Sequence, residues 1–459
     1  MNTKPVINRE DEQRQISTVL QALRQSRVKQ GQPWPIVHLS GVAGIGKTTL
    51  LLQVQQQAHA LGLPVLWGTV RPGAHIDAVA SQLLSDLPSP PLSPSPGERH
   101  DPTPDHTTPG LAQLIPRLRL LVHQQGAAVL LLDDVEIGNA SQLRWLVALL
   151  DALGKETPLL LVQTAAGSLP WSWQTVLNRP VLPLELGPLD RVSSALLLDR
   201  HAPTLAPEAR ALALTWAAGY PLALVVLADA LRDGTLVPRQ PADRTRLLEQ
   251  LTERVLRHGV LGALPPAERP AVETLLRLLA VPRRFTAMLL QDLIEQFVPE
   301  WRQSDPFAYF FLPQQLAART HALRWQFERA GYVVVAPVRH LLQVLWQEEA
   351  PARWREILRW LAAFQERLTA RASGPERIRS LADQLAYRLL GEEPTRRVEQ
   401  MPSVLASLHQ EPQAVSLQVV AALQQDQDLQ AALGEQASDW QAALQALERE
   451  ILAQEQGKE

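Results

Sequence analysis

The chain has 459 residues, which allows about three domains of roughly 150 residues each. Its 44 basic and 47 acidic residues give a formal net charge of −3, so no overall field draws the chain onto nucleic acid or anionic lipid. The absence of cysteine excludes disulfides, thiolate zinc sites, iron–sulfur clusters and cysteine nucleophiles.

The first residues and the hydropathy of the chain favour a cytoplasmic protein. The start, MNTKPVINREDEQRQ, is polar and lacks the apolar core of a signal peptide. No apolar run reaches the ~18 residues that a transmembrane helix needs. We therefore expect no membrane association.

Apolar strands alternate with helices in the first part of the chain. We predict helices at 47–61 and 76–87, and strands at 35–41, 64–70, 127–133, 158–164 and 180–186. Strands that are apolar throughout and separated by helices form a parallel sheet covered on both faces. The sequence thus predicts an α/β domain over residues 1–188.

A proline-rich segment interrupts this domain. Residues 88–110 contain eight prolines, with Ser, Thr and Asp between them. Such a segment buries too little apolar surface to offset the entropy of ordering, so we expect a mobile surface insertion that acts as a plain linker. A PxxP docking ligand is the alternative interpretation.

Strand signals nearly vanish after residue 188. Four helical stretches indicate a lid domain over 189–259, and we place them at 190–202, 206–219, 221–234 and 242–258. Further on, the pattern predicts two helices within 266–298, a helix at 313–330 and a β-hairpin or single strand at 331–338. Helices followed by a short β element indicate a winged-helix-like domain over 260–349.

The remaining residues, 350–459, are predicted to form an all-α region. Its last part, 401–459, holds nine acidic and two basic residues, which disfavours contacts with a DNA backbone. Apolar residues recur there at helical spacing: Leu429, Leu433, Trp440, Leu444, Leu447 and Ile451. We expect them to be buried within the region, and docking of a protein partner or self-association through it is the alternative.

The strongest functional signal follows the first predicted strand. The segment matches the phosphate-binding pattern GxxxxGK[ST] and comprises Gly41, Val42, Ala43, Gly44, Ile45, Gly46, Lys47, Thr48 and Thr49. Glycines let consecutive backbone N–H groups point at phosphate oxygens, and the following helix adds its positive N-terminal end. Lys47 would reach the β- and γ-phosphates, and the Thr48 hydroxyl would ligate Mg²⁺. The sequence therefore predicts a P-loop that binds ATP or ADP with Mg²⁺.

The strand predicted at 127–133 ends in Asp133, and a second acidic residue, Asp134, follows it. Acids at the carboxyl end of a buried parallel strand lie on the same edge of the sheet as the P-loop. Asp133 would hold Mg²⁺, and Asp134 would orient or activate the attacking water, so Asp134 and Lys47 are the predicted catalytic residues. A strand-ending turn is the structural alternative.

Together with the sequence GYPLAL at 219–224, these motifs resemble the STAND signal-transduction ATPases, the AAA+-related group that includes NB-ARC proteins and bacterial regulators. GYPLAL is similar to the family's GxP motif, whose proline packs against the nucleotide base. The resemblance thus implies this role for Pro221. A plain helix–break–helix corner with proline in the first helical turn is the alternative.

Two weaker elements extend the resemblance. The segment 6–10, VINRE, is similar to a motif whose apolar and arginine residues line the adenine site, which implies this role for Ile7 and Arg9. The segment at 338–342, VRHLL, resembles the MHD element, whose histidine contacts the β-phosphate of ADP in the closed state. This implies a nucleotide contact for His340, although Leu341 replaces the usual aspartate. A polar arm and an ordinary histidine are the respective alternatives.

One departure bears on catalysis. The family often carries an arginine after the fourth strand to sense the γ-phosphate, whereas this chain has the sequence LVQTAA at 161–166. Thr164 remains as a weaker phosphate sensor. The resemblance therefore implies a slow ATPase.

The resemblance implies an intracellular molecular switch, with a closed ADP form and an open or oligomeric ATP form. A transcription regulator that binds DNA through its winged helix or tail is one alternative. An ORC-like AAA+ ATPase is the other, and that group is expected to show an arginine in the lid and a more basic winged helix. GYPLAL favours the switch over DNA binding.

Overall fold

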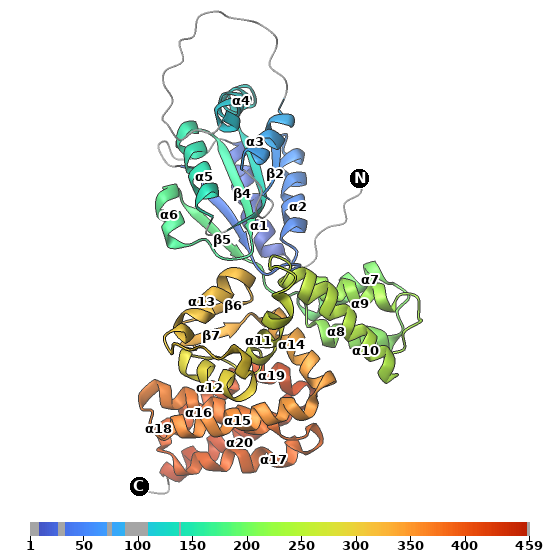
Figure 1. Cartoon of the computed structure of the whole chain (residues 1–459), viewed down its shortest axis with the longest axis vertical. Coiled ribbons are helices and arrows are strands. Elements are labelled where there is room, and N and C mark those ends of the chain that lie inside the picture. The colour runs from blue at the N-terminus through green and yellow to red at the C-terminus, as the bar shows by residue number, and fades with distance from the viewer. Residues whose placement is uncertain (1–8, 26–32, 71–75, 88–108, 137–138, 457–459) are drawn as a thin grey trace, which may run out of the picture. The chain divides into compact units, whose positions relative to one another are not determined.

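The computed structural model describes residues 9–25, 33–70, 76–87, 109–136 and 139–456 (Figure 1). The chain divides into two compact units. Unit 1 comprises residues 1–265 with 319–321, and unit 2 comprises residues 266–318 with 322–459. Most of the predicted insertion at 88–110 lies outside the described residues, and its last two residues, Pro109 and Gly110, begin a helix.

Unit 1 contains a five-stranded sheet in which every neighbouring pair is parallel. The strands follow the order β2-β3-β4-β1-β5, and they are β1 (Ile36–Ser40), β2 (Val65–Thr69), β3 (Ala128–Val135), β4 (Leu159–Ala165) and β5 (Val181–Glu185). All five predicted strands are present, and the predicted α/β fold with a parallel sheet is confirmed.

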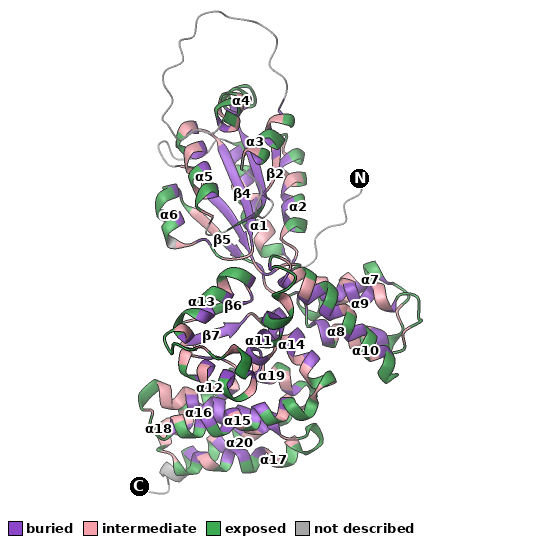
Figure 2. Cartoon of the chain, viewed as in Figure 1, coloured by how far each residue is buried: buried purple, intermediate pink, exposed green. Residues whose placement is uncertain are grey.

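Helices cover both faces of this sheet, because its central strands are apolar on both sides (Figure 2). Leu130 and Leu132 of β3 belong to a core shared with four helices, while Val129 and Leu131 are buried on the opposite face. The helices of this part are α1 (Glu10–Arg24), α2 (Lys47–Ala60), α3 (Ile76–Ser85), α4 (Pro109–Gln125), α5 (Ala140–Leu153) and α6 (Trp171–Leu177).

The rest of unit 1 is helical. It comprises α7 (Arg191–His201), α8 (Pro207–Ala217), α9 (Pro221–Leu231), α10 (Pro241–Gln250) and the π-helix η1 (Leu251–Val260). Proline occupies the first turn of three of these helices, where its missing N–H removes no intrahelical bond. The helix predicted at 242–258 thus forms as α10 continued by a π-helix.

The first part of unit 2 corrects one prediction. A helix was expected at 313–330, but α13 spans Ala308–Thr320 and the strand β6 spans Leu323–Gln326. Asp305 explains the earlier start, because its carboxylate accepts the backbone N–H of Phe307 just before the helix. β6 pairs antiparallel with β7 (Gly331–Val334), so the hairpin uses residues that the sequence had assigned to the helix.

Further helices complete this part of unit 2. They are α11 (Arg269–Leu279), α12 (Ala287–Phe297), the 3₁₀ turn η2 (Pro299–Trp301) and α14 (Ala336–Glu349). An isolated bridge joins Phe285, between α11 and α12, to Tyr332 of β7. The hairpin is therefore attached to the helices by backbone pairing.

Residues 350–459 belong to the same compact unit. The α-helices there are α15 (Pro351–Thr369), α16 (Gly374–Gly391), α17 (Arg397–Leu405), α18 (Gln413–Gln424), α19 (Gln427–Leu433) and α20 (Ala437–Gln456). Short 3₁₀ turns lie between some of them: η3 (Pro394–Arg396), η4 (Ala406–Gln410) and η5 (Gly434–Gln436). All six apolar residues singled out in the tail sequence are buried, as expected.

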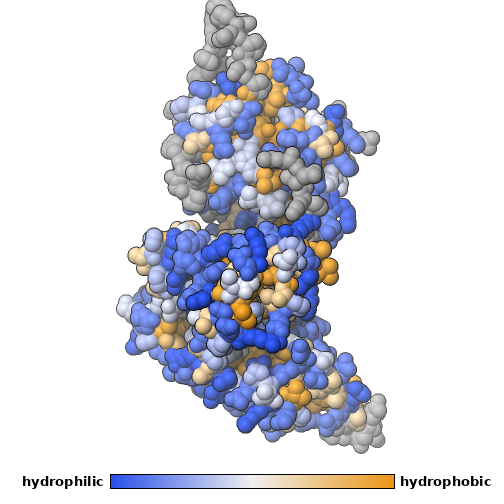
Figure 3. Space-filling model, turned by 90° about the vertical axis from the view of Figure 1, so that its right-hand side faces the viewer, coloured by the Kyte–Doolittle hydropathy of each residue, from blue (hydrophilic) through white to orange (hydrophobic). Residues whose placement is uncertain are grey.

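The face of the molecule shown in Figure 3 is mostly polar. Hydrophilic residues dominate there, and apolar residues form small groups between them. No helix within the described ranges combines the length and the hydropathy needed to cross a membrane.

Candidate nucleotide-binding site

The P-loop lies between β1 and α2, where the parallel sheet presents the carboxyl ends of its strands. Gly46 adopts a left-handed conformation with a φ of 103° and forms the N-cap of α2. At Gly44, a Cβ atom would lie 2.5 Å from the Cβ of Leu222 in the lid. Glycine at this position therefore lets the lid approach the loop closely.

Lys47 closes the loop on itself. Its ammonium donates to the carbonyls of Gly41 at 2.8 Å and Val42 at 3.1 Å. Burial lowers the pKa of Lys47, while the negative charges of Asp134 and Asp133 act in the opposite direction. The lysine thus holds a positive charge inside the loop, where a phosphate can replace the two carbonyl oxygens as its partner.

The sheet order brings the predicted magnesium ligands together. The Thr48 hydroxyl donates to Asp133 at 3.0 and 3.2 Å, and the Thr164 hydroxyl donates to the same carboxylate at 2.6 Å. A carboxylate beside a hydroxyl is the oxygen donor set that suits Mg²⁺, which keeps waters and takes substrate phosphates as its other ligands. Thr48 and Asp133 therefore fit the ion, which would neutralise charge on the phosphates.

Asp134 has a strained backbone. Its φ of 61° lies in the left-handed region, and the register of β3 against β4 shifts between Leu132 and Val135. The Thr164 hydroxyl accepts the Asp134 N–H at 2.8 Å, which helps to hold this conformation. Partial burial of the Asp134 carboxyl raises its pKa, and Lys47 acts in the opposite direction. The Asp134 side chain is more exposed than that of Asp133, and both carboxylates lie within the field of Lys47.

The lid contacts the P-loop directly. The Tyr220 hydroxyl donates to the Ala43 carbonyl at 2.5 Å, and the Leu222 N–H donates to the Gly44 carbonyl at 3.2 Å. Tyr220 is fully buried, and this burial raises the pKa of its hydroxyl, which therefore stays a donor. The carbonyls of two loop residues are consequently satisfied by the segment that carries Pro221.

A cavity of about 940 Å³ opens between the loop and the lid, within the range of small-molecule sites. Gly44 to Thr49, Arg9 and Pro221 line it, and their contacts with a nucleotide stay a prediction. The lid adds residues that the sequence analysis missed: Leu189, Leu197, Arg200, His201, Leu222, Val225 and Arg232. Arg200 and His201 lie in the last turn of α7. The sequence shows that this helix end is basic, but the helical period of the apolar residues does not show which face of the helix lies against the P-loop.

Arg9 has a structural role besides lining the cavity. Its guanidinium is buried and donates to the carbonyls of Gly187 at 2.6 Å and Ile45 at 3.3 Å. Burial lowers the pKa of Arg9, and Glu12 acts in the opposite direction. Arg9 therefore joins the start of α1 to the P-loop. Ile7, the other predicted adenine contact, lies outside the described residues.

His340 belongs to α14 of unit 2, whereas the cavity is lined by residues of unit 1. Its contact with the β-phosphate stays a prediction. The described residues contain no group of three or more His, Asp or Glu side chains that could hold a metal.

The comparisons with known proteins agree with the P-loop. Residues 6–162 match the family model described as "AAA ATPase domain", which supports a P-loop AAA+ ATPase fold in this part of the chain, and nucleotide binding is expected of that fold. The match does not reach the finer STAND or NB-ARC class. No curated protein shows significant similarity to the chain.

Similar solved structures include an Orc1 protein, a Cdc6 protein and a RuvB motor. The Orc1 protein of Aeropyrum pernix, in complex with DNA, shares 16% identity over 76% of this chain and 95% of that chain, with a TM-score of 0.39. Cdc6p from Pyrobaculum aerophilum shares 17% identity over 76% of this chain and 96% of that chain, with a TM-score of 0.40. The RuvB Holliday junction branch migration motor of Thermotoga maritima shares 17% identity over 73% of this chain and 95% of that chain, with a TM-score of 0.37.

Proposed function

We propose that the chain is a STAND-type molecular switch that binds ATP or ADP with Mg²⁺ in the cavity of unit 1. The observation that carries this proposal is the pair of hydrogen bonds from Tyr220 and Leu222 to the carbonyls of Ala43 and Gly44. Because the lid is bonded to the loop that takes the phosphates, any change in the loop's contacts also changes the lid's. A nucleotide can thereby favour one arrangement through its different affinity for the two.

Each part of the site has a distinct task in this proposal. The loop amides and Lys47 hold the phosphates, while Thr48 and Asp133 hold Mg²⁺. Asp134 orients the attacking water, and Thr164 senses the γ-phosphate through its hydroxyl. Pro221 packs against the base. Thr164 already bonds Asp133 and Asp134, so it connects the metal ligand with the water-orienting residue.

Calorimetry with ADP and Mg²⁺ tests the binding step. Lys47→Ala removes one charge-assisted phosphate contact worth roughly 1.5–3 kcal/mol, so the affinity should fall about ten- to a hundred-fold. Lys155→Ala, at an exposed lysine of the same unit that does not line the cavity, is the matched control and should bind ADP normally. Equal affinity in wild type and Lys47→Ala would refute the P-loop assignment.

Turnover tests the role of Asp134. We expect hydrolysis well below the roughly 1–100 s⁻¹ of kinases, because no arginine follows Thr164 in β4. Asp134→Asn should lower this rate further while ADP stays bound. Fast turnover by the wild type, or full activity of the variant, would contradict this mechanism.

An ORC-like, DNA-binding AAA+ ATPase is the second candidate. The observation in its favour is that Arg200 and Arg232 of the lid line the nucleotide cavity, since an arginine in the lid is expected of that group. In this view α11 to α14 with the hairpin β6–β7 form a winged-helix-like module, as the order of its elements suggests.

The surface of this module mixes apolar and basic side chains. Phe307, Phe310, Phe311 and Phe327 are exposed on and beside α13 and at the hairpin, and so are Arg302, Arg319 and Arg324. DNA affinity that falls steeply with salt would support the second candidate, because counterion release makes phosphate contacts salt-dependent. Absence of such binding would leave the switch as the better proposal.

A further inference from the structure

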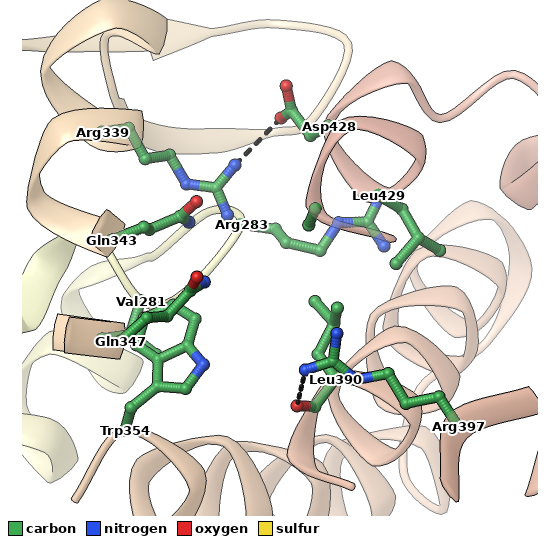
Figure 4. A pocket seen from close by; sticks show the side chains of 11 residues that line it. Val281, Arg283, Arg339, Gln343, Gln347, Trp354, Leu390, Arg397, Asp428 and Leu429 are labelled. Carbon is green, nitrogen blue, oxygen red and sulfur yellow. Dashed lines mark hydrogen bonds and ion pairs between the residues drawn. The ribbon is translucent and has the colours of Figure 1, made fainter. Parts of the chain in front are cut away.

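A second cavity lies wholly within unit 2, where the helices α14, α15, α16, α17 and α19 and the segment after α11 meet (Figure 4). The centre of a water molecule can occupy about 20 Å³ of this cavity. When the radius of the water molecule, about 1.4 Å, is added, a round cavity of this size has a radius of roughly 3 Å. Three arginines line it: Arg283 after α11, Arg339 on α14 and Arg397 at the start of α17. A single carboxylate, that of Asp428, lines it with them.

Two of these arginines are paired with carboxylates. Arg339 donates to Asp428 at 3.1 Å, and Asp428 also accepts from Arg329 at 2.6 Å. Arg283 lies against Asp383 and Asp426. Together, the carboxylates of Asp383, Asp426 and Asp428 are therefore already engaged by arginines.

Arg397 differs from its neighbours. Its guanidinium donates only to backbone carbonyls, those of Glu392 at 3.3 Å and Leu390 at 3.1 Å, and no described carboxylate forms an ion pair with it. Burial lowers the pKa of Arg397, and the positive charge of Arg355 lowers it further. A partly buried guanidinium beside a second cation, without a counter-charge, favours an external anion.

An independent observation comes from Arg283. Its Nε atom is buried and has no hydrogen-bond partner in the described structure. A buried donor without a partner costs about 1–3 kcal/mol, so native proteins nearly always supply a partner for it. Arg283 and Arg397 line the same cavity with the amides of Gln343 and Gln347, and all four side chains carry N–H donors (Figure 4).

We propose that this cavity is an anion site that takes a phosphate group, bound by Arg397 and Arg283. A cavity of this size admits a tetrahedral oxyanion but not a whole nucleotide. Guanidinium groups suit such an oxyanion because their N–H donors form a planar fork that matches two of its oxygens. Trp354 and Leu390 form the apolar wall, which excludes water and strengthens the charged contacts.

Phosphate calorimetry on the full chain tests this site. The Lys47→Ala background removes the contribution of the P-loop, and chloride keeps the ionic strength constant between titrations. The Lys47→Ala protein should still bind inorganic phosphate, and adding Arg397→Gln should weaken binding at least about tenfold. Adding Arg396→Gln, at the exposed neighbour that does not line the cavity, removes the same charge and should leave binding unchanged.

A second variant guards against misfolding of the first. Gln347 is exposed at the cavity, so Gln347→Glu adds a negative charge without disturbing a packed side chain. It should also weaken phosphate binding about tenfold. Lack of phosphate binding by the Lys47→Ala protein, or unchanged binding in both Arg397→Gln and Gln347→Glu, would overturn the proposal.

A competition arm identifies the source of the phosphate group. If a phosphate monoester such as glycerol phosphate displaces inorganic phosphate, the site holds the phosphoryl end of a larger ligand. If it does not, the site is specific for the free ion. Either result is consistent with the anion site, and both depend on the prior finding that phosphate binds.

Discussion

The two cavities of this chain handle positive charge in different ways. In unit 1, Lys47 donates to carbonyls five and six residues away, and the rest of the phosphate cradle is the backbone of a glycine-rich turn. In unit 2, arginines pair with acids far along the chain, such as Arg284 with Asp383 at 3.0 Å across 99 positions. Unit 1 thus builds its phosphate cradle locally, while unit 2 joins distant segments through buried charge.

This difference implies different weaknesses. A site made of backbone amides and one lysine loses its ligand when the lysine is removed, but the fold keeps its apolar sheet. A unit held by buried ion pairs is destabilised when one partner is removed, because the other charge stays behind without compensation. The following predictions test this contrast, beginning with the largest effect.

Asp383→Ala should destabilise unit 2 most. Asp383 is buried and lies within ion-pair distance of both Arg283 and Arg284, so its removal leaves two buried guanidiniums with one acid fewer. We expect a loss of about 3–5 kcal/mol in the free energy of unfolding, measured by denaturant titration. Glu356→Ala, which breaks the exposed pair with Arg353, should cost less than about 1 kcal/mol. Similar losses in both variants would argue against buried charge as the main support of unit 2.

In unit 1 the most sensitive position should be a glycine. Gly219 has a φ of 81°, and a Cβ atom there would lie 2.1 Å from the carbonyl oxygen of Leu189. Gly219→Ala should cost more than about 2 kcal/mol, since a clash adds to left-handed strain. Gly234 has a φ of 64°, but a Cβ atom there would meet no other atom within 4 Å. Gly234→Ala should therefore cost only the left-handed strain, about 1 kcal/mol. Thermal unfolding of the two variants measures the difference, and equal effects would mean that the lid does not require this close approach.

As the pH falls, unit 1 should lose stability at a higher pH than unit 2. Burial lowers the pKa of His38 on β1. The contribution of neutral His38 to the stability of the fold is therefore present above about pH 6.5 and is lost as the pH falls below that value. The loss is at most about 1.4 kcal/mol per pH unit. The pKa of Asp428 is lowered, because the positive charges of Arg339 and Arg329 outweigh the opposite effect of burial. The contribution of ionised Asp428 to the stability of the fold is therefore lost only below about pH 3.9. Hydrogen exchange resolved by peptide should show β1 losing protection at higher pH than α19. The reverse order would contradict the assignment.

Tyr220→Phe should have a smaller effect on stability than Asp383→Ala or Gly219→Ala. It removes one buried hydrogen bond, to Ala43, and retains the ring, so we expect a loss of about 1 kcal/mol. If the lid controls the loop, the same variant should also release ADP faster in a stopped-flow chase. Tyr332→Phe, whose ring packs on Phe285 and Trp325 in unit 2, serves as the control and should leave ADP release unchanged.

The sequence predicted the part of unit 1 whose chemistry is local. Gly41 to Thr49 form one continuous motif, and Asp133 and Thr164 end strands whose apolar runs are plain in the sequence. A parallel sheet brings such strand ends to one edge, so the order of strands and helices along the chain is enough to expect that these residues meet. Pro221 was singled out from a short motif, and it lines the cavity of unit 1.

The residues that were missed depend on tertiary structure. Arg200 and Arg232 lie on helices, and helical period does not show which basic residue faces a loop elsewhere in the chain. The anion site of unit 2 combines Arg283 with Arg397, which are separated by more than a hundred positions and belong to no motif. The hairpin strand β6 was assigned to a helix because its four residues are too few to establish a period of two.

Small-angle scattering of the full chain tests the proposed switch most directly. Profiles would be compared in saturating ADP and in a non-hydrolysable ATP analogue, each with Mg²⁺, and Lys47→Ala serves as the control that should not respond. We expect a compact particle in ADP and a more extended or self-associated one in the ATP analogue, because the two nucleotides favour different arrangements of lid and loop. Identical profiles in both nucleotides, from protein shown by calorimetry to be saturated, would mean that this chain binds nucleotide without acting as a switch.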